Sequence, residues 1–410
     1  MAVFLPFKGL LPKPEMVAKV AAVPYDVVNT AEAAELAEAN PFSFLRISRP
    51  EIELEKGIDL YSDAVYEKAA ENFKRLCELA PLLTDPEPHI YIYKLRMGEH
   101  TQIGLVGAAA TEDYKNDIIK KHEKTRQDKE DDRARHVMTL RSQTGPVFLT
   151  YKDSKEIDET VNAIMNDQTP DFNFTADDGI QHSLWRVPVD ASKKISAMFE
   201  NIPYLYIADG HHRAASAARA AETCRINNPH HTGTEDYNFF LTVSFPASQL
   251  KILPYNRVVH SLNGLDVDEF IEKIKENFEI ENPASDKPVE SGDMRMYLDG
   301  QWYKLTPKMD INSLGVIGSL DVSVLQDYIL DPLLGIDDPR TSKKIDFVGG
   351  IRGTEQLVKL VDSGKGAVAF SMFPTTVEQL MAIADADEIM PPKSTWFEPK
   401  LRDGLVCHNF

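Results

Sequence analysis

The segment 204–225 constrains the fold of this chain more than any other. It begins with the apolar run Tyr204–Ala208, continues with the pair Asp209-Gly210, and then becomes rich in alanine. A short apolar run bounded by a turn signal favours a buried strand. Asp-Gly marks a turn, and alanine is the best helix former. The sequence therefore predicts a strand, a tight turn and a helix in direct succession.

Strand and helix patterns alternate along the rest of the chain, and no internal repeat interrupts them. Thr30 is the expected N-cap of the first helix. Such mixing predicts an α/β or α+β fold, with a first domain over 1–250 and a second mixed α/β domain over 251–410. The expected helices are 31–40, 58–80, 153–166 and 211–225, and the expected strands are 89–97, 101–111, 146–151, 181–189 and 240–245.

The charge and composition exclude several classes of protein. The formal net charge is -19, which disfavours broad binding of DNA or RNA. The three cysteines are widely separated and form no C-x-x-C pair, which indicates a reducing compartment. The chain has no signal peptide pattern and no apolar run of roughly 20 residues. We therefore expect a soluble, cytoplasmic protein without a membrane partner, whose oligomeric state the sequence leaves open.

The turn within segment 204–225 carries the strongest chemical signal. A glycine turn between strand and helix directs free backbone N–H groups at one point, where anions bind. An arginine there offers a bidentate donor, two imidazoles add hydrogen-bonding or acid–base groups, and an aspartate caps the helix or helps to hold a divalent cation. The alternative is a helix cap followed by exposed polar residues. The candidate residues are Asp209, Gly210, His211, His212 and Arg213.

These residues are also part of a wider resemblance. The chain is identified as a member of the domain of unknown function 1015 family, whose signature is of this Asp-Gly-His-His-Arg type. The resemblance spans nearly the whole chain. It is carried further by Val23–Val28, Asn40–Ile47, His122–Thr125, Ile252–Arg257 and Met390–Leu401.

A more remote resemblance links the turn to the ParB/sulfiredoxin superfamily, which includes partition proteins, sulfiredoxins and the archaeal free serine kinase. It implies a ParB/sulfiredoxin-like core with insertions, which binds phosphate or nucleotide at Gly210–Arg213. It also implies phosphoryl transfer from ATP or ADP, with Mg²⁺, to a serine-like metabolite. A phosphatase acting on phosphoserine, with His211 or His212 as nucleophile or acid, fits the same residues. A non-catalytic nucleotide-binding regulator is the third reading.

The segment 114–141 is almost wholly polar, so we expect a surface loop followed by an exposed helix. A mixed charge run of this kind is usually a solvated face, but the family match favours a loop that folds over a substrate. His122 and Glu123 then share the cleft with the turn, and Glu123 is the candidate general base. Lys124 or Arg126 would neutralise phosphate charge. The wide spacing of the histidines here predicts no structural zinc.

For further polar residues, the sequence leaves two alternatives open: an ion pair within the protein or contact with a ligand. Arg46 lies among apolar residues and needs an anionic partner, either Asp26 or a ligand. Arg257 stands in a similar setting, beside Asn256. The segment Lys393–Thr395 is either an anion-binding loop or a surface tail.

Overall fold

The structure is a computed structural model that describes residues 1–80 and 82–410. The chain forms two compact units. The first comprises residues 1–250 and 399–410, and the second comprises residues 251–398. The mixed α/β class expected from the sequence is confirmed. The last twelve residues, which the sequence analysis assigned to the C-terminal region, belong to the first unit.

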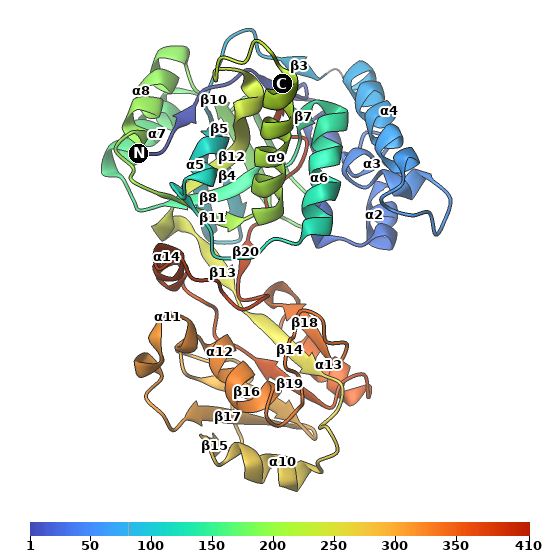
Figure 1. The fold of residues 1–410 in the computed structure, drawn as a ribbon, viewed down its shortest axis with the longest axis vertical. Helices are drawn as coiled ribbons and strands as arrows, with labels where there is room; N and C mark the ends of the chain where they lie inside the picture. The colour runs from blue at the N-terminus through green and yellow to red at the C-terminus, as the bar shows by residue number, and fades with distance from the viewer. Residues whose placement is uncertain (81) are drawn as a thin grey trace. The chain divides into compact units, whose positions relative to one another are not determined.

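The first unit is built on a mixed sheet with the strand order β6-β11-β8-β12-β5-β4-β10-β9, with β1 paired to β5 at the side (Figure 1). β11 runs parallel to β6 and antiparallel to β8, whereas β8 and β12 are parallel. The predicted hairpin is confirmed as β4 and β5. The strands are β1 Phe4–Leu5, β4 Tyr91–Met97, β5 His100–Ala110, β6 Ile119–Lys120, β8 Val147–Tyr151, β9 Phe172–Thr175, β10 Gln181–Arg186, β11 Leu205–Asp209 and β12 Phe239–Pro246.

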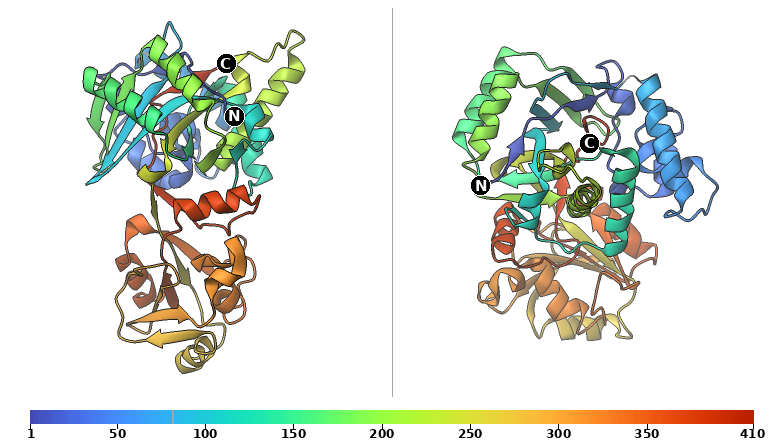
Figure 2. Two further views of the ribbon diagram at one scale, coloured as in Figure 1. Left: turned by 90° about the vertical axis from the view of Figure 1, so that its left-hand side faces the viewer. Right: turned by 45° about the horizontal axis from the view of Figure 1, so that its top comes forward.

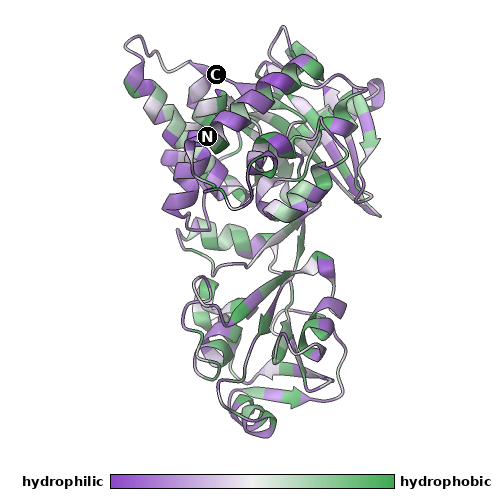
Figure 3. Ribbon diagram, turned by 90° about the vertical axis from the view of Figure 1, so that its right-hand side faces the viewer, coloured by the Kyte–Doolittle hydropathy of each residue, from purple (hydrophilic) through white to green (hydrophobic). Residues whose placement is uncertain are grey.

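Helices cover this sheet, and further helices pack beside them. The apolar core gathers side chains from the sheet, α7, α8 and α9, and α6 packs between α9 and α4 (Figure 1). Polar and apolar residues alternate around most of these helices (Figure 3). They are α1 Val17–Val20, α2 Thr30–Ala37, α3 Leu45–Ser48, α4 Asp63–Leu79, α5 Thr111–Lys115, α6 Gln127–Leu140, α7 Lys155–Asp167, α8 Val189–Phe199 and α9 His211–Asn227, with the short 3₁₀ turns η1 Tyr25–Val27, η2 Pro50–Glu53, η3 Asp236–Asn238 and η4 Ala247–Gln249.

A small sheet fastens the C-terminal segment into this unit. Its strand order is β3-β2-β21-β7, and both chain ends lie in the first unit (Figure 2). Main-chain bonds between Ala22 and Asp403 add a further bridge to the N-terminal region. No local pattern in residues 399–410 predicts these strand pairings, because they join positions far apart in the chain. The strands are β2 Gly9–Leu11, β3 Leu83–Thr84, β7 Ser142–Gln143 and β21 Cys407–Asn409.

The second unit has its own six-stranded antiparallel sheet, in the order β15-β17-β16-β19-β14-β18, and a separate ribbon of β13 and β20. The strands are β13 Lys251–Leu253, β14 Tyr255–Val259, β15 Phe278–Glu281, β16 Met294–Leu298, β17 Gln301–Pro307, β18 Ile345–Gly349, β19 Val368–Ser371 and β20 Trp396–Glu398. The helices are α10 Val267–Ile274, α11 Gly315–Gly318, α12 Asp321–Leu325, α13 Glu355–Asp362 and α14 Val377–Asp385, with the short turns η5 Ile311–Leu314, η6 Gln326–Leu330 and η7 Gly350–Arg352.

Two details of the expected helices are wrong. The N-cap of α2 is Asn29 rather than Thr30, because the Asn29 side chain accepts from the N–H groups of Ala31 and Glu32. The helix α6 is not simply exposed: Asp132 and His136 on its inner face are buried against neighbouring helices. Both side chains form hydrogen bonds to other parts of the folded chain. A helix of mainly polar residues can therefore be partly buried.

Among the described residues, no single helix combines the length and apolar composition needed to cross a membrane. Only the bent pair Ile311–Gly318 and Asp321–Leu330 meets that test, by length and composition alone.

Candidate active site

The predicted strand, turn and helix are confirmed as β11, Gly210 and α9. Gly210 has φ 98° and ψ 30°, a left-handed conformation that side chains disfavour. A Cβ atom at this position would also lie 3.0 Å from both Cζ and Nε of Arg213. Glycine is therefore required here by backbone conformation and by the close approach of the guanidinium.

The first turn of α9 keeps its main-chain donors free of protein caps. The first helical bond runs from Ala214 N–H to the Gly210 carbonyl oxygen at 3.0 Å. No side chain in the described parts of the chain caps the helix. The preceding N–H groups of His211, His212 and Arg213 therefore remain available to an acceptor, and the helix dipole favours an anionic one.

Both histidines of the turn hold the loop 121–126 over the helix end. The N–H of Arg126 donates to His212 Nε2 at 3.1 Å, and the N–H of His122 approaches His211 Nε2 at 3.5 Å. The rings of His122 and His211 meet edge to face, with centroids 4.4 Å apart. The structure thus brings the 121–126 loop to the turn, about ninety positions away in the chain, as the sequence analysis expected.

Burial keeps these imidazoles neutral. It lowers the pKa of His122 to about 4 and places the pKa of His211 well below its ordinary range, where the neighbouring His122 lowers it further. Burial also lowers the pKa of His212. Neutral rings suit their role as hydrogen-bond acceptors for the 121–126 loop.

Glu123 is the exposed acid of this site, with 48% of its side chain accessible. Its Oε2 lies 3.7 Å from Nδ1 of His211. The N–H of His122 faces Nε2 of this ring, so a proton on Nδ1 would point toward the carboxylate, at a distance longer than a hydrogen bond. Glu123 therefore lies beside the ring and is reachable by a substrate.

Asp209 lies between two cations rather than beside open coordination space. Its Oδ2 binds Lys400 Nζ at 3.0 Å, and its Oδ1 lies 3.7 Å from Arg213 Nη2. Burial opposes ionisation, but these two cations outweigh it and hold the pKa of Asp209 well below its usual range. No group of three or more His, Cys, Asp or Glu in the described residues could hold a metal ion. Lys400 and Arg213 already neutralise Asp209, and its suggested role in binding Mg²⁺ stays a prediction.

Arg213 is built into the fold more deeply than the sequence indicated. Nη1 donates to the Pro146 carbonyl oxygen, and Nη2 lies 3.9 Å from Asp26 as well as close to Asp209. The side chain is 9% exposed, and Nε is buried without a partner among the described residues. Burial opposes the charge, but the carboxylates of Asp26 and Asp209 raise the pKa of Arg213 above its ordinary value. Arg213 therefore has a structural role besides any contact with a ligand.

Two functional candidates come from the C-terminal segment. The sequence analysis included Lys400 in a family motif without a role, and it did not single out Asp403. The Asp403 side chain accepts from the N–H of Tyr25 and is 3% exposed. Burial raises its pKa to about 7, although Arg213 acts against this shift. Asp403 can be recognised as a site residue only in the folded structure, where it contacts Tyr25.

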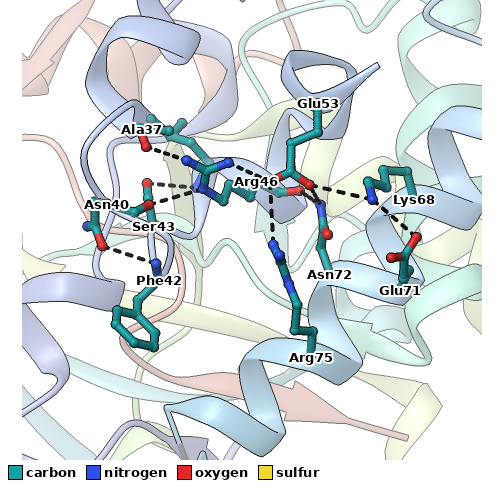
Figure 4. A network of polar contacts seen from close by, with 11 residues as sticks. Ala37, Asn40, Phe42, Ser43, Arg46, Glu53, Lys68, Glu71, Asn72 and Arg75 are labelled. Carbon is teal, nitrogen blue, oxygen red and sulfur yellow. Dashed lines mark hydrogen bonds and ion pairs between the residues drawn. The ribbon is translucent and has the colours of Figure 1, made fainter.

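The remaining candidates divide into those beside the turn and those elsewhere. Lys124 is exposed next to Glu123, and Arg126 is exposed and paired with Asp128 at 2.8 Å. Arg46 belongs to another network, in which it binds Glu53 and the carbonyl oxygens of its own region (Figure 4). The carboxylate partner of Arg46 is Glu53 rather than Asp26, which was one of the two alternatives, because η2 follows α3 directly and supplies that carboxylate.

In the second unit, Arg257 and the segment Lys393–Thr395, whose roles the sequence left undecided, contact one another. Arg257 is 3% exposed and donates to the carbonyl oxygens of Tyr255 and Lys393, the latter at 3.1 Å. Burial lowers the pKa of Arg257 to about 10. Asn256 accepts from the N–H of Met372 at 3.0 Å. These contacts stabilise the second unit, and the two alternatives for Lys393–Thr395, an anion-binding loop or a surface tail, stay predictions.

A family model described as "Protein of unknown function (DUF1015)" matches residues 4–323. The chain belongs to this family. A search of curated proteins returned no match.

Several solved structures share a remote likeness with this member of the family. A free serine kinase in complex with AMP is 14% identical, with a TM-score of 0.35, over 68% of this chain and 84% of its own. A conserved hypothetical protein from Pyrococcus furiosus is 14% identical, with a TM-score of 0.35, over 70% and 90%. SbnI with a C-terminal truncation, from Staphylococcus aureus, is 10% identical, with a TM-score of 0.39, over 73% and 85%. Likeness at this level carries no argument about activity.

Proposed function

We propose that this protein binds the phosphates of a nucleotide at the first turn of α9 and transfers a phosphoryl group to a small metabolite, with serine as the favoured acceptor. The observation that carries the proposal is the pairing of an uncapped helix N-terminus with the accessible carboxylate of Glu123 beside it. An anion site next to a base is what phosphoryl transfer to a hydroxyl requires.

The phosphates would be held by main-chain groups more than by side-chain charge. Three N–H groups at the turn and the positive end of the helix dipole attract an anion. Lys400 and Arg213 add positive charge but share it with Asp209. Lys124 and Arg126 are exposed cations of the covering loop, and Lys124 could approach the outer phosphate oxygens.

The chemical step assigns one role to Glu123. Its carboxylate takes the proton of the acceptor hydroxyl, and the hydroxyl oxygen forms a bond to the terminal phosphorus of ATP or ADP. The bond from that phosphorus to its bridging oxygen breaks, and ADP or AMP leaves. The imidazole of His211 lies beside this carboxylate, with Nδ1 3.7 Å from Oε2 of Glu123.

The phosphatase alternative has weaker support. A histidine nucleophile needs an accessible ring nitrogen, but Nε2 of His211 and Nε2 of His212 both face main-chain N–H groups of the loop. A non-catalytic regulator would use the same nucleotide site without needing Glu123. A cytoplasmic location agrees with the free thiols of Cys77, Cys224 and Cys407.

The test is an assay of the full chain by ³¹P NMR. The protein is incubated with L-serine and either ATP or ADP as the magnesium complex, and separately with phosphoserine. The proposal expects phosphoserine to form, and Glu123→Gln to slow its formation by about 10²–10⁴-fold while nucleotide affinity is retained. The control is Glu159→Gln, which changes an exposed glutamate on α7 and should leave the rate unchanged.

Each other outcome points elsewhere. Hydrolysis of phosphoserine without any forward transfer would favour the phosphatase. Nucleotide binding without turnover would favour the regulator. Full activity in Glu123→Gln would remove the base from the mechanism.

A further inference from the structure

A cavity of about 40 Å³ lies in the first unit beside Arg213 and is not used by the proposed phosphate site. A water molecule needs about 10–15 Å³ of such space, so the cavity holds roughly three waters, about the room that a small amino acid takes. A nucleotide is far too large for it. Its polar lining includes Tyr25, Arg133, His136, Thr144, Arg213 and Asp403.

Two buried polar atoms on this lining lack partners in the described parts of the chain. They are Oδ1 of Asp403 and Nε of Arg213. Native interiors rarely leave such groups unsatisfied, because each one costs free energy unless water or a ligand completes it. The other contact of the Asp403 carboxyl group is the N–H of Tyr25. The cavity therefore presents one open acceptor and one open donor.

Arg133 contributes a second guanidinium to the polar lining. Arg133 lies over the Tyr25 ring at 4.2 Å from its centroid, and its Nε and Nη2 bind Asp132 at 2.8 Å. Its Nη1 is the nitrogen that remains for a ligand. His136 donates from Nε2 to the Ile47 carbonyl oxygen at 2.9 Å and, as a neutral ring, keeps Nδ1 as an acceptor.

The charged side chains around the cavity favour one class of small ligand over another. Both guanidinium groups already face carboxylates, so a phosphate dianion would enter beside Asp26, Asp132 and Asp403 without a surplus of positive charge. A zwitterion matches the lining better, because it brings a carboxylate for the guanidinium donors and an ammonium group for the open acceptor.

We propose that this cavity binds a small α-amino acid, with Arg133 and Arg213 holding its carboxylate and Asp403 accepting from its ammonium group. That the bound amino acid is the phosphoryl acceptor rests on the proposed function, whereas the binding itself does not. Burial places the pKa of Asp403 at about 7, so its charged form is available to the ammonium group near neutral pH and above.

The test is calorimetric titration of the full chain with L-serine, D-glycerate and ADP as separate probes. L-serine should bind to the wild type, and Arg133→Met should weaken it at least tenfold. The matched control is Arg135→Met on the same helix, which lines no part of the cavity and pairs with Asp63; it should change the affinity less than twofold. Asp403→Asn, nearly isosteric, should weaken L-serine binding but leave D-glycerate unaffected, because glycerate has no ammonium group.

Gly145→Ala gives an independent probe of the same pocket. The new methyl group would stand 2.7 Å from Asp403 Oδ1, and it should exclude L-serine. If Arg133→Met fails to fold, Asp403→Asn and Gly145→Ala decide the matter. Equal L-serine affinity in these variants and the wild type, or no binding at about 10 mM, overturns the proposal. ADP binding without L-serine binding defeats this pocket alone, whereas L-serine binding without ADP binding defeats the proposed function alone.

Discussion

Arg213 in the first unit and Arg257 in the second are buried arginines in family motifs, yet their surroundings are opposite. Arg213 lies near two carboxylates at the start of an uncapped helix, and its pKa is raised. Arg257 is held by carbonyl oxygens, and burial lowers its pKa to about 10. In the second unit, Thr376 caps the helix α14 with its own side chain. We therefore expect an anion site beside Arg213, where the backbone donors of the helix end are left open, and none beside Arg257.

The largest expected effect comes from removing each guanidinium in turn. Arg213→Met removes the cation beside Asp26 and leaves Asp209 with Lys400 alone, which should cost about 3–5 kcal/mol of unfolding free energy. Arg257→Met removes a buried charge that has no carboxylate partner, but it leaves the carbonyl oxygens of Tyr255 and Lys393 without this donor, so its cost should be about 1–3 kcal/mol. Urea unfolding followed by circular dichroism measures both. Equal losses would show that the two arginines do the same structural work.

The next effect distinguishes Asp403 from Asp209, two carboxyl groups near Arg213, by how their contributions to stability depend on pH. The folded pKa of Asp403 is about 7, above its ordinary 3.8, so its stabilising contribution is complete below about pH 4 and is lost as the pH rises through 7. Asp403→Asn should therefore gain stability relative to the wild type over this range, by roughly 4 kcal/mol at most. Thermal unfolding from pH 4 to 8 measures the difference.

Asp209 provides the matched opposite case. Its pKa is depressed, so its contribution is present above the ordinary pKa and is lost as the pH falls through the folded value. Asp209→Asn should be less stable than the wild type at pH 7, and the deficit should shrink in acid. Parallel pH profiles for the two variants would contradict the assignment of charge at this site.

A smaller effect tests why the turn needs glycine. Gly210→Ala meets both a left-handed φ and the Arg213 side chain, and should cost about 1–3 kcal/mol. Gly353→Ala in the second unit has a φ of 69° but no atom within 4 Å of the new methyl group. The loss in unfolding free energy should therefore be larger for Gly210→Ala. Equal losses would mean that the guanidinium moves aside freely.

The sequence predicted what is local and missed what depends on distant partners. The order of apolar run, Asp-Gly and alanine-rich stretch determines β11, the turn and α9, because each acts on its own neighbours. Lys400 binds Asp209, which lies 191 positions away in the sequence, and no spacing rule predicts such a contact. The polar helix α6 was expected to be exposed, yet His136 on it is buried. Its partner is a carbonyl oxygen 89 positions away.

A crystal structure of the full chain with bound ADP would show whether the first turn of α9 holds the phosphates of a nucleotide. We expect the terminal phosphate within hydrogen-bond distance of the N–H groups of His211, His212 and Arg213, with Glu123 facing the same space. ADP bound elsewhere in the first unit, or in the second unit near Arg257, would contradict it.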